Sequence, residues 1–438
     1  MVDPEHLLDR VVEKIKDRVD EYVVIVSDSN ELMAKYARGE STVTQSWRSL
    51  SVNIYVAKNS KTFITSFEAE SPIRVLEKLE SIIGMLQPNP FYAPLPEPTG
   101  QSSSSIDKVV KEVAISGEAE DKLEELELNV LGDFAGKVEF TYERVLLASS
   151  TGADLRHEGT SFNGYMRVFR DDSSGQWAWT SVEYNPELAR KACSQAKELA
   201  DTCYRLPRQK IKPGRYKVLL SPMVVGNLVD YFANAASASS VIFGMSFLHG
   251  KEPGSKLFSE ELTILDRPRD QSLPGYRGFD DEGYSTMDKP IVEEGVFRGL
   301  LHNSKTAKAM KAENTGNAGW ITPRPFNLEV LQGSAKLEEL FRELRDGIYI
   351  TNNWYTRYQN YLEGVFSTVS RDAVIVFRDG EPVACSEARI RIADSMPRLF
   401  SDIDAISRER WDLEWWEVRT PSRVPFMLFR DVNITTPQ

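Results

Sequence analysis

A proline- and serine-rich stretch, residues 87–105 (QPNPFYAPLPEPTGQSSSS), interrupts the chain. Proline fixes φ and lacks a backbone N–H, so the five prolines in this stretch exclude a continuous helix or a central strand. We therefore expect a linker here, with Phe91 and Tyr92 packing onto a neighbouring domain. A second stretch, residues 206–214 (LPRQKIKPG), predicts another linker. The chain should accordingly fold as segments joined by these linkers.

The first segment, residues 1–100 with the linker at its end, predicts a small α/β domain. Asp3-Pro4 combines a capping side chain with proline at the first helical position, so a helix should begin there. Tyr22–Ser27 and Val52–Val56 are rich in β-branched and aromatic residues and predict strands. A second helix should follow Ser71-Pro72 and bury an apolar stripe of Ile73, Leu76, Leu79 and Ile83.

The middle segment, residues 107–206, predicts a central α+β domain. Lys137–Ser149 and His157–Arg170 have the composition of strands and are separated by a short glycine-containing turn. A helix should follow Asn185-Pro186, which supplies an N-cap and a first-turn proline. Its predicted buried face consists of Leu188, Ala192, Ala196, Leu199 and Cys203.

The last segment, residues 213–438, predicts a large β-rich domain with flanking helices. A strand at Tyr216–Ser221 should lead into a helix opened by Pro222, and Asp379-Gly380 is a strong signal for a hairpin turn. Further helices are expected near residues 334–345 and 397–408. The fold class predicted for the whole chain is therefore α+β.

Charge and cysteine content restrict the environment of the protein. The chain has 53 basic and 65 acidic residues, a formal net charge of −12, which disfavours direct contact with nucleic acid. The chain has only three cysteines, Cys193, Cys203 and Cys385. Such a small, odd number does not suit a disulfide framework and favours the reducing cytoplasm. Cys193 and Cys203 could pair, but both are expected on one helix. The acidic N-terminus predicts no secretory signal, and no apolar run is long enough to span a membrane.

Tests for catalytic chemistry give no nucleophile and no metal site in this chain. The four histidines, His6, His157, His249 and His302, are too far apart for paired imidazoles on one helix. The nearest approaches to a nucleophile elbow, residues 244–248 and 159–163, lack the closing glycine. A phosphate loop is also excluded, because the glycine spacing before Lys251 is too long and Glu252 follows the lysine.

Three polar runs remain as candidates. Asp280-Asp281-Glu282-Gly283 is either a solvated turn or a functional acidic loop, and Thr315–Gly319 (TGNAG) is a glycine-punctuated loop. Asn352–Tyr361 (NNWYTRYQNY) suits a recognition surface rich in tyrosine, and equally an ordinary strand with alternating faces. None of these runs identifies a function by itself.

Taken as a set, the C-terminal segments resemble those of the TldD/PmbA family, whose members were described as modulators of DNA gyrase and are regarded as metalloproteases. Their order and spacing agree over more than half of the last segment, whereas the first two segments agree only in architecture. The segments that carry the resemblance are SFLHGKEPGSKLFSEELTILD (246–266), GFDDEG (278–283), IVEEGVFRGLLHNSKTA (291–307), NTGNAG (314–319), GVFSTVSRDAVIVFRDGE (364–381) and PSRVPFMLFRDVNIT (421–435).

The family has two branches, and the helix after the first strand of the last domain distinguishes them. TldD-type subunits carry a His-Glu-x-x-x-His zinc motif on that helix and a zinc-binding cysteine near the C-terminus. Here the helix is MVVGNLVDYFANAASASS (223–240), with Asp230, Tyr231 and Asn234 near the expected motif positions and no histidine. Residues 411–425 contain no cysteine. The chain therefore resembles the TldE/PmbA branch, which lacks the zinc motif.

This resemblance implies a noncatalytic, cytoplasmic subunit, inactive alone, that pairs with a zinc-bearing TldD-type subunit to cleave unfolded or extended peptides. No catalytic residue, metal ligand or cofactor is expected in this chain, and a homodimer is possible when it is alone. By analogy, Asp281, Glu282 and Asn317 are expected to line a peptide channel. Two other hypotheses stay open: a self-associating peptide-binding protein or adaptor without protease activity, and an enzyme with metal-free chemistry.

Overall fold

A computed structural model describes residues 2–68 and 76–436 of the chain. The first half forms a curved seven-stranded sheet, and all strand pairs in it are antiparallel except β4–β6. In spatial order its strands are β3 (Lys61–Glu68), β2 (Glu40–Lys58), β1 (Glu21–Ala37), β5 (Phe134–Ser149) and β6 (Asp154–Arg170), with β4 (Ser103–Ser105) and β7 (Ser173–Ser181) both pairing to β6.

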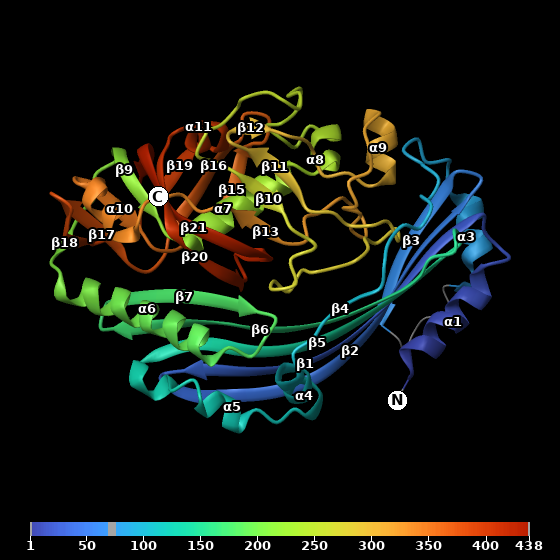
Figure 1. Cartoon of the computed structure of the whole chain (residues 1–438), viewed down its shortest axis with the longest axis horizontal. Helices are drawn as coiled ribbons and strands as arrows, with labels where there is room; N and C mark the ends of the chain where they lie inside the picture. The colour runs from blue at the N-terminus through green and yellow to red at the C-terminus, as the bar shows by residue number, and fades with distance from the viewer. Residues whose placement is uncertain (1, 69–75, 437–438) are drawn as a thin grey trace.

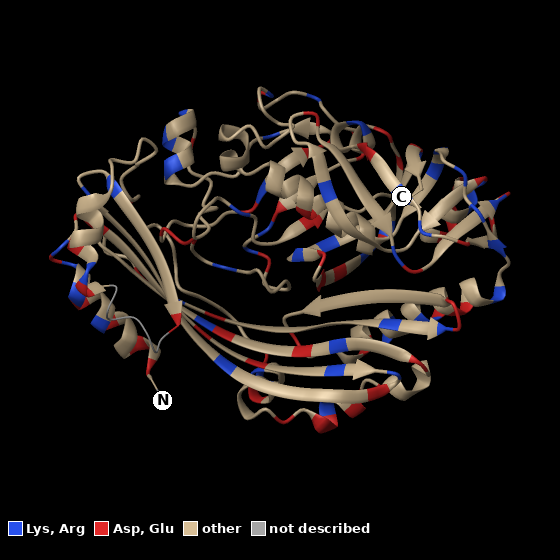
Figure 2. Cartoon of the chain, turned by 180° about the vertical axis from the view of Figure 1, so that it is seen from behind, with Lys and Arg blue, Asp and Glu red and all other residues tan. Residues whose placement is uncertain are grey.

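Helices cover the outer, convex side of this sheet (Figure 1). At one end α1 (Pro4–Ile15) and α3 (Leu79–Met85) pack on apolar side chains of β1 and β2 and bury Leu8, Ile15 and Leu79. Toward the other end lie α4 (Lys108–Ser116), α5 (Glu120–Glu124), the short 3-10 helix Leu128–Leu131 and α6 (Pro186–Arg205). Basic and acidic residues are interspersed along the long strands (Figure 2), as expected for strands with one apolar and one polar face.

The second half forms a fourteen-stranded mixed sheet that lies on the opposite side of the curved sheet (Figure 1). Its main path is β12 (Val296–Phe297), β11 (Lys289–Glu293), β10 (Ile264–Asp266), β13 (Leu328–Val330), β21 (Val418–Thr435), β9 (Gly214–Leu220), β14 (Gly347–Ile350), β17 (Val374–Arg378), β18 (Glu381–Ser386) and β8 (Arg208–Gln209). A branch from β21 contains β19 (Arg391–Ser395), β16 (Val365–Ser370) and β15 (Asn353–Asn360), and β20 (Ile403–Trp415) also pairs with β21. The helices are α7 (Pro222–Ala235), α8 (Ala238–Ile242), α9 (Ser304–Met310), α10 (Leu337–Leu344) and α11 (Met396–Ser401).

The predicted α+β class is confirmed, with long strands dominating the first half. The predicted first and middle domains share one sheet, because β1 pairs with β5 over nearly its whole length, from Val23↔Ser149 to Tyr36↔Gly136. These two segments are therefore one structural unit. The linker at 87–105 lacks helix and long strand as predicted, but its last residues form β4. The Phe91 ring packs 6.1 Å from that of Phe243, which confirms its contact with another domain.

Several local predictions need correction. Asp3 precedes α1, but its side chain makes no capping hydrogen bond. The strand predicted at residues 22–27 extends to Ala37. The helix predicted at 397–408 ends at Ser401, because the residues from Ile403 onward pair with β21 as β20. Ile73 and the start of the second predicted helix lie outside the described residues.

The structure forms a disulfide other than the Cys193–Cys203 pair that the sequence left open. Cys203, near the end of α6, is bonded to Cys385 of β18, with 5.4 Å between their Cα atoms. Cys193 lies on the same helix as Cys203, as predicted, and is a buried free thiol. The sequence could not reveal this pair because 182 positions separate the two cysteines. No helix among the described residues is long and apolar enough to cross a membrane.

Candidate functional site

Helix α7 is the element on which a TldD-type subunit would carry its zinc motif. It follows β9 directly, with Pro222 in its first turn, and the preceding Ser221 hydroxyl donates to the Thr351 carbonyl at 2.6 Å. All but two of its residues are buried, and it lies against β21 and β15. The helix is thus packed against strands of the second sheet.

The polar residues of α7 are already engaged within the chain. Asp230 accepts a hydrogen bond from the Thr420 hydroxyl at 2.7 Å, and the Tyr231 hydroxyl donates to the Thr356 carbonyl. Asn234 donates to the backbone carbonyl of Asp230 at 2.8 Å. Burial is the main cause that raises the pKa of Asp230, so this position favours a neutral carboxyl more than a surface aspartate does.

One turn earlier, Asn227 centres a buried polar layer between α7 and β15. Its amide group donates to the Glu417 carbonyl at 2.7 Å, and its side-chain oxygen accepts from Asn353 at 2.7 Å and from the Thr356 hydroxyl at 2.5 Å. Thr356 and Asn353 both also contact the Thr368 hydroxyl. These bonds satisfy buried polar groups and fix the register of β15 against the helix.

This donor set does not fit a zinc ion. His157 is buried beside the Ser103 hydroxyl at 2.8 Å, and burial lowers its pKa to about 3. His302 is buried next to Thr306, and His249 contacts the Val241 carbonyl. Among residues 2–68 and 76–436, no three His, Cys, Asp or Glu side chains are grouped as metal ligands. Within the described part of the chain, the α7 side chains and these histidines are engaged in hydrogen bonds rather than grouped as zinc ligands.

Glu414 lies where β20 faces the curved sheet near α7. Burial, with the charge of Glu139 as the next cause, raises the pKa of Glu414 to about 7. Lys137 opposes this shift, the Thr180 hydroxyl lies 3.5 Å away, and Asp230 contributes further negative charge. The contact between the two sheets thus contains a carboxyl that titrates near neutral pH.

We expect Glu414→Gln to change how stability depends on pH. Because the folded-state pKa is raised, the unfolded chain loses the Glu414 proton first, and stability falls as pH rises from about 4.5 to about 7. Glu414→Gln has no carboxyl to ionise, so its stability does not fall in this way. At pH 8 its free energy of unfolding should exceed that of the wild type by on the order of 2–3 kcal/mol. Urea unfolding at several pH values measures it. The control is Glu381→Gln, at an exposed hairpin position, which should leave the pH dependence of stability unchanged. If stability varied with pH in the same way in the wild type and in Glu414→Gln, the raised pKa of Glu414 would be contradicted.

The acidic loop predicted from the sequence meets the glycine-punctuated loop. Asp280 is fully buried and accepts from the backbone N–H groups of Glu282, Tyr284 and Ala318 at 2.9–3.0 Å. The Asp281 N–H donates to the Ala318 carbonyl at 3.1 Å. Burial and the neighbouring Glu282 raise the pKa of Asp280. The loop is thus a turn fixed by buried hydrogen bonds rather than a solvated turn.

Glu282 and Asn317 are buried, whereas Asp281 is half-buried. Glu282 accepts from the Ser304 hydroxyl at 2.7 Å and from the Ser304 N–H at 3.0 Å, at the start of α9. Burial is the main cause that raises the pKa values of Asp281 and Glu282. The structure therefore brings the three predicted residues into one loop cluster, and the expectation that they line a peptide channel stays a prediction about an assembly.

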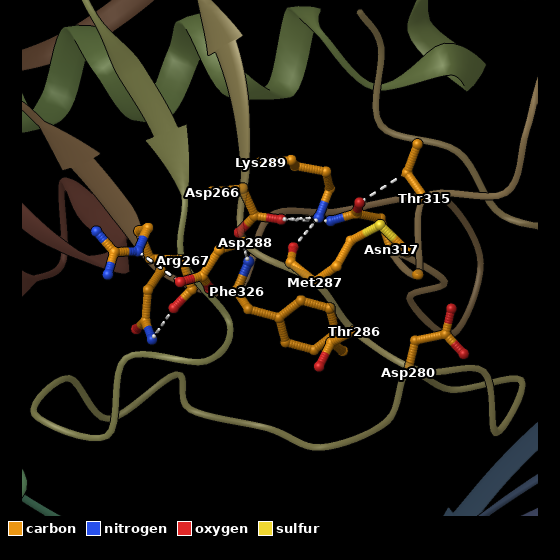
Figure 3. A network of polar contacts seen from close by, with 12 residues as sticks. Asp266, Arg267, Asp280, Thr286, Met287, Asp288, Lys289, Thr315, Asn317 and Phe326 are labelled. Atoms are coloured by element: carbon orange, nitrogen blue, oxygen red, sulfur yellow. Dashed lines mark hydrogen bonds and ion pairs between the residues drawn. The ribbon is translucent and has the colours of Figure 1, made fainter. Parts of the chain in front are cut away.

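Asp266 and Lys289 complete this cluster and were missed by the sequence analysis (Figure 3). Asp266 accepts from Lys289 at 3.0 Å, from the Asn317 side chain at 2.6 Å and from the Phe326 N–H at 2.9 Å. Asn317 in turn accepts from the Thr315 hydroxyl at 2.8 Å. The only local signal for Asp266 was its place at the end of a short apolar strand, which many surface aspartates share.

The same loops join the two halves of the molecule. The Gly100 N–H donates to the Gly283 carbonyl at 3.0 Å, and the Gly278 N–H donates to the Ser103 hydroxyl at 2.9 Å. Phe279 is buried in an apolar cluster with Val145, Leu147 and other residues of the curved sheet. A Cβ on Gly278 would lie 2.1 Å from the Gln101 carbonyl oxygen, so only glycine permits this approach. The geometry indicates that the loop cluster positions one sheet over the other.

Comparison with known proteins agrees with this architecture. The model of the PmbA/TldA metallopeptidase C-terminal domain matches residues 213–436, and that of the central domain matches residues 107–200. The crystal structure of TldE from Thermococcus kodakarensis has a TM-score of 0.84 at 19% identity, covering 98% of this chain and 100% of that chain. A proposed modulator of a DNA gyrase from Thermotoga maritima MSB8 has a TM-score of 0.80 at 22% identity, with 98% and 100% covered.

Among curated relatives, Metalloprotease MJ0996 from Methanocaldococcus jannaschii is 29% identical over 161 residues, which are 35% of this chain and 36% of that protein. The chain spans about a third of the length of the first such relatives it matches. The structural likenesses show the fold, whereas the C-terminal family model alone covers more than half of the chain. The chain belongs to the PmbA/TldD metallopeptidase family.

Proposed function

We propose that this chain is the noncatalytic, TldE/PmbA-like subunit of a heteromeric TldD-type zinc metalloprotease that cleaves unfolded or extended peptides. The observation that supports this proposal most is how the polar side chains of α7 are hydrogen-bonded. Asp230 and Tyr231, near the positions of the zinc motif in TldD-type subunits, are held by Thr420 and Thr356 of this chain. They act as structural hydrogen-bonding groups here, and zinc is expected in the partner subunit.

The contribution of this chain would then be binding and assembly. The polar layer around Asn227 holds β15 rigidly, and among the described strands β15 pairs only with β16. An extended peptide can bind to such a strand edge through main-chain hydrogen bonds, with little demand on its sequence. By analogy with the family, the loop cluster of Asp281, Glu282 and Asn317 faces the interior of the assembly.

We expect peptide cleavage only when this chain and a zinc-bearing TldD-type subunit are mixed. An unfolded test protein should be cleaved at least about tenfold faster by the mixture than by either chain, because the site needs both surfaces to hold an extended peptide. Chelator treatment of the partner should abolish the activity, whereas the same treatment of this chain, followed by chelator removal, should leave it unchanged. Zinc-dependent cleavage by this chain alone would refute the proposal.

Copurification from the source cell distinguishes the heteromer from the second candidate, a self-associating peptide-binding protein or adaptor. A heteromeric subunit should come out with a second chain that carries the His-Glu-x-x-x-His motif. Recovery of homomers that bind peptides but lack such a chain would favour the adaptor.

A further inference from the structure

The beginning of β15 and three loops of the second sheet gather aromatic and cationic side chains into one surface, which we name the Arg–Trp patch. The Arg371 guanidinium lies between two indole rings, 5.1 Å from the centre of Trp354 and 4.9 Å from that of Trp416. Arg389 lies over Trp354 as well, at 4.9 Å. The members of the patch are Trp354, Tyr355, Arg357, Arg371, Arg389 and Trp416.

The positive charges of the patch are poorly compensated. The Arg371 side chain is only 14% exposed, and its Nη1 is buried without a hydrogen-bond acceptor. The nearest carboxylate oxygen, Oδ2 of Asp372, is 3.8 Å from Arg371 Nε. That carboxylate is already bound by Arg167 at 2.5 Å and by Asn352 at 2.8 Å. Burying a guanidinium without a carboxylate that accepts its hydrogen bonds costs free energy. Arg371 therefore indicates that a hydrogen-bond acceptor from a ligand binds here.

Two further observations in the patch point to the same acceptor. The Trp354 indole N–H is a second buried donor without a partner. Among the ion pairs of the described residues, none involves Arg357 or Arg389. The acids near the patch are Asp372 and Glu417, whose charges act on Arg371, and Glu417 also accepts from the Tyr355 N–H. An anion at this surface would therefore gain charge-assisted hydrogen bonds where the rest of the protein would repel it.

The patch is open to a ligand. Trp416 and Tyr355 are 52% and 56% exposed. A cavity of about 280 Å³ adjoins the patch. It is lined by Arg167, Arg208 and Arg389 together with the carboxylates of Asp172, Asp372 and Glu387. Tyr355 has a φ of 55°, which is unfavourable for an aromatic residue, and its N–H donates to Glu417 at 3.3 Å. Backbone strain of this kind is concentrated at functional sites.

We propose that the Arg–Trp patch binds a carboxylate of an extended peptide, either an acidic side chain or the C-terminal carboxylate. Guanidinium groups match a carboxylate with two parallel hydrogen bonds, and the exposed rings add apolar contact for the rest of the peptide. A peptide fits better than a nucleic acid, because β15 begins within the patch and one of its edges is free of other described strands. The proposal rests on the proposed function only in taking a peptide as the ligand.

Fluorescence anisotropy with this chain alone tests the proposal. The probes are a short labelled glycine- and serine-rich peptide amide containing glutamates, its glutamine counterpart as an amide, the same glutamine peptide with a free C-terminal carboxylate, and a labelled oligothymidine. We expect at least one of the two carboxylate-bearing peptides to bind roughly tenfold or more tightly than the glutamine amide. The glutamate and free-acid arms separate the two sources of the carboxylate.

Substitutions at exposed positions avoid disrupting the fold. Arg389→Gln and Trp416→Ala should each reduce carboxylate-peptide binding by roughly tenfold, whereas Arg10→Gln, an exposed residue on α1, removes the same charge and should not. Equal binding of all peptides, full affinity of Arg389→Gln, or preference for the oligothymidine would overturn the proposal. Because no partner is used, absence of joint proteolysis would refute the proposed function and leave this result unaffected.

Discussion

Replacing Cys203 and Cys385 together by alanine is expected to be among the most destabilising changes in this chain. The bond closes a loop of 182 positions, and the chain-entropy model gives about 5 kcal/mol for a loop of that length. It also fastens α6, which covers the curved sheet, to β18 near the edge of the other sheet. Loss of the bond should lower the Tm by several degrees, measured by calorimetry.

Reductant provides the matching control for the disulfide. The double variant should unfold at the same temperature with and without a dithiol reductant, whereas the wild type should lose stability when reduced. Cys193→Ala removes the buried free thiol and keeps the bond, so it should retain the full response to reductant. A wild type that is indifferent to reductant, with a Tm equal to that of the double variant, would show that the bond does not stabilise the protein.

Asp266→Ala is expected to cause the second large effect, about 3–5 kcal/mol of lost stability. Its carboxylate is fully buried and binds Lys289, the Asn317 side chain and the Phe326 N–H. Removing it leaves the Lys289 ammonium group without its ion-pair partner, on a side chain that is only 14% exposed. It also releases the loop that contains Asn317, so the contact between the two sheets should loosen. Urea unfolding and hydrogen exchange of residues 314–319 measure the two consequences.

Asp431→Ala is a matched control for this prediction. Asp431 also pairs with a cation, Arg215, at 2.6 Å, but both side chains are nearly half exposed. Solvent screens such a pair, so its loss should cost under about 1 kcal/mol. If Asp266→Ala were no more destabilising than Asp431→Ala, the loop cluster would not be a structural element of the interface.

The local elements that could be predicted have signals contained within a few residues. Asn185-Pro186 predicted the start of α6, and the Asn185 side chain does accept from the Leu188 N–H. Asp379-Gly380 predicted the hairpin between β17 and β18, and both residues have positive φ. Strand length was harder to predict, because β1 continues past residue 27 through polar positions such as Asp28, which is paired with Arg48 of the neighbouring strand β2.

The candidate site was predictable only in part, for the same reason. The runs Asp280–Gly283 and Thr315–Gly319 were recognisable as unusual loops, and the structure joins them through the backbone of Ala318. The run at 352–361, for which a surface and a strand were both open, forms β15, and its first aromatic residues belong to the Arg–Trp patch. Arg371, Arg389 and Trp416 carried no signal, since nothing in their local sequence indicates that they share one surface.

By itself, the sequence determined the α+β class, the caps and turns, the family resemblance and the residues on α7 that stand in place of a zinc motif. These depend on short-range chemistry: backbone propensity, capping and the identity of side chains at fixed spacings. Only the tertiary structure decided that the first two segments share a sheet, that Cys203 meets Cys385, and that arginines from separate loops converge on Trp354. Such contacts arise when strands distant in sequence pair, and no local pattern records which distant residues that pairing brings together.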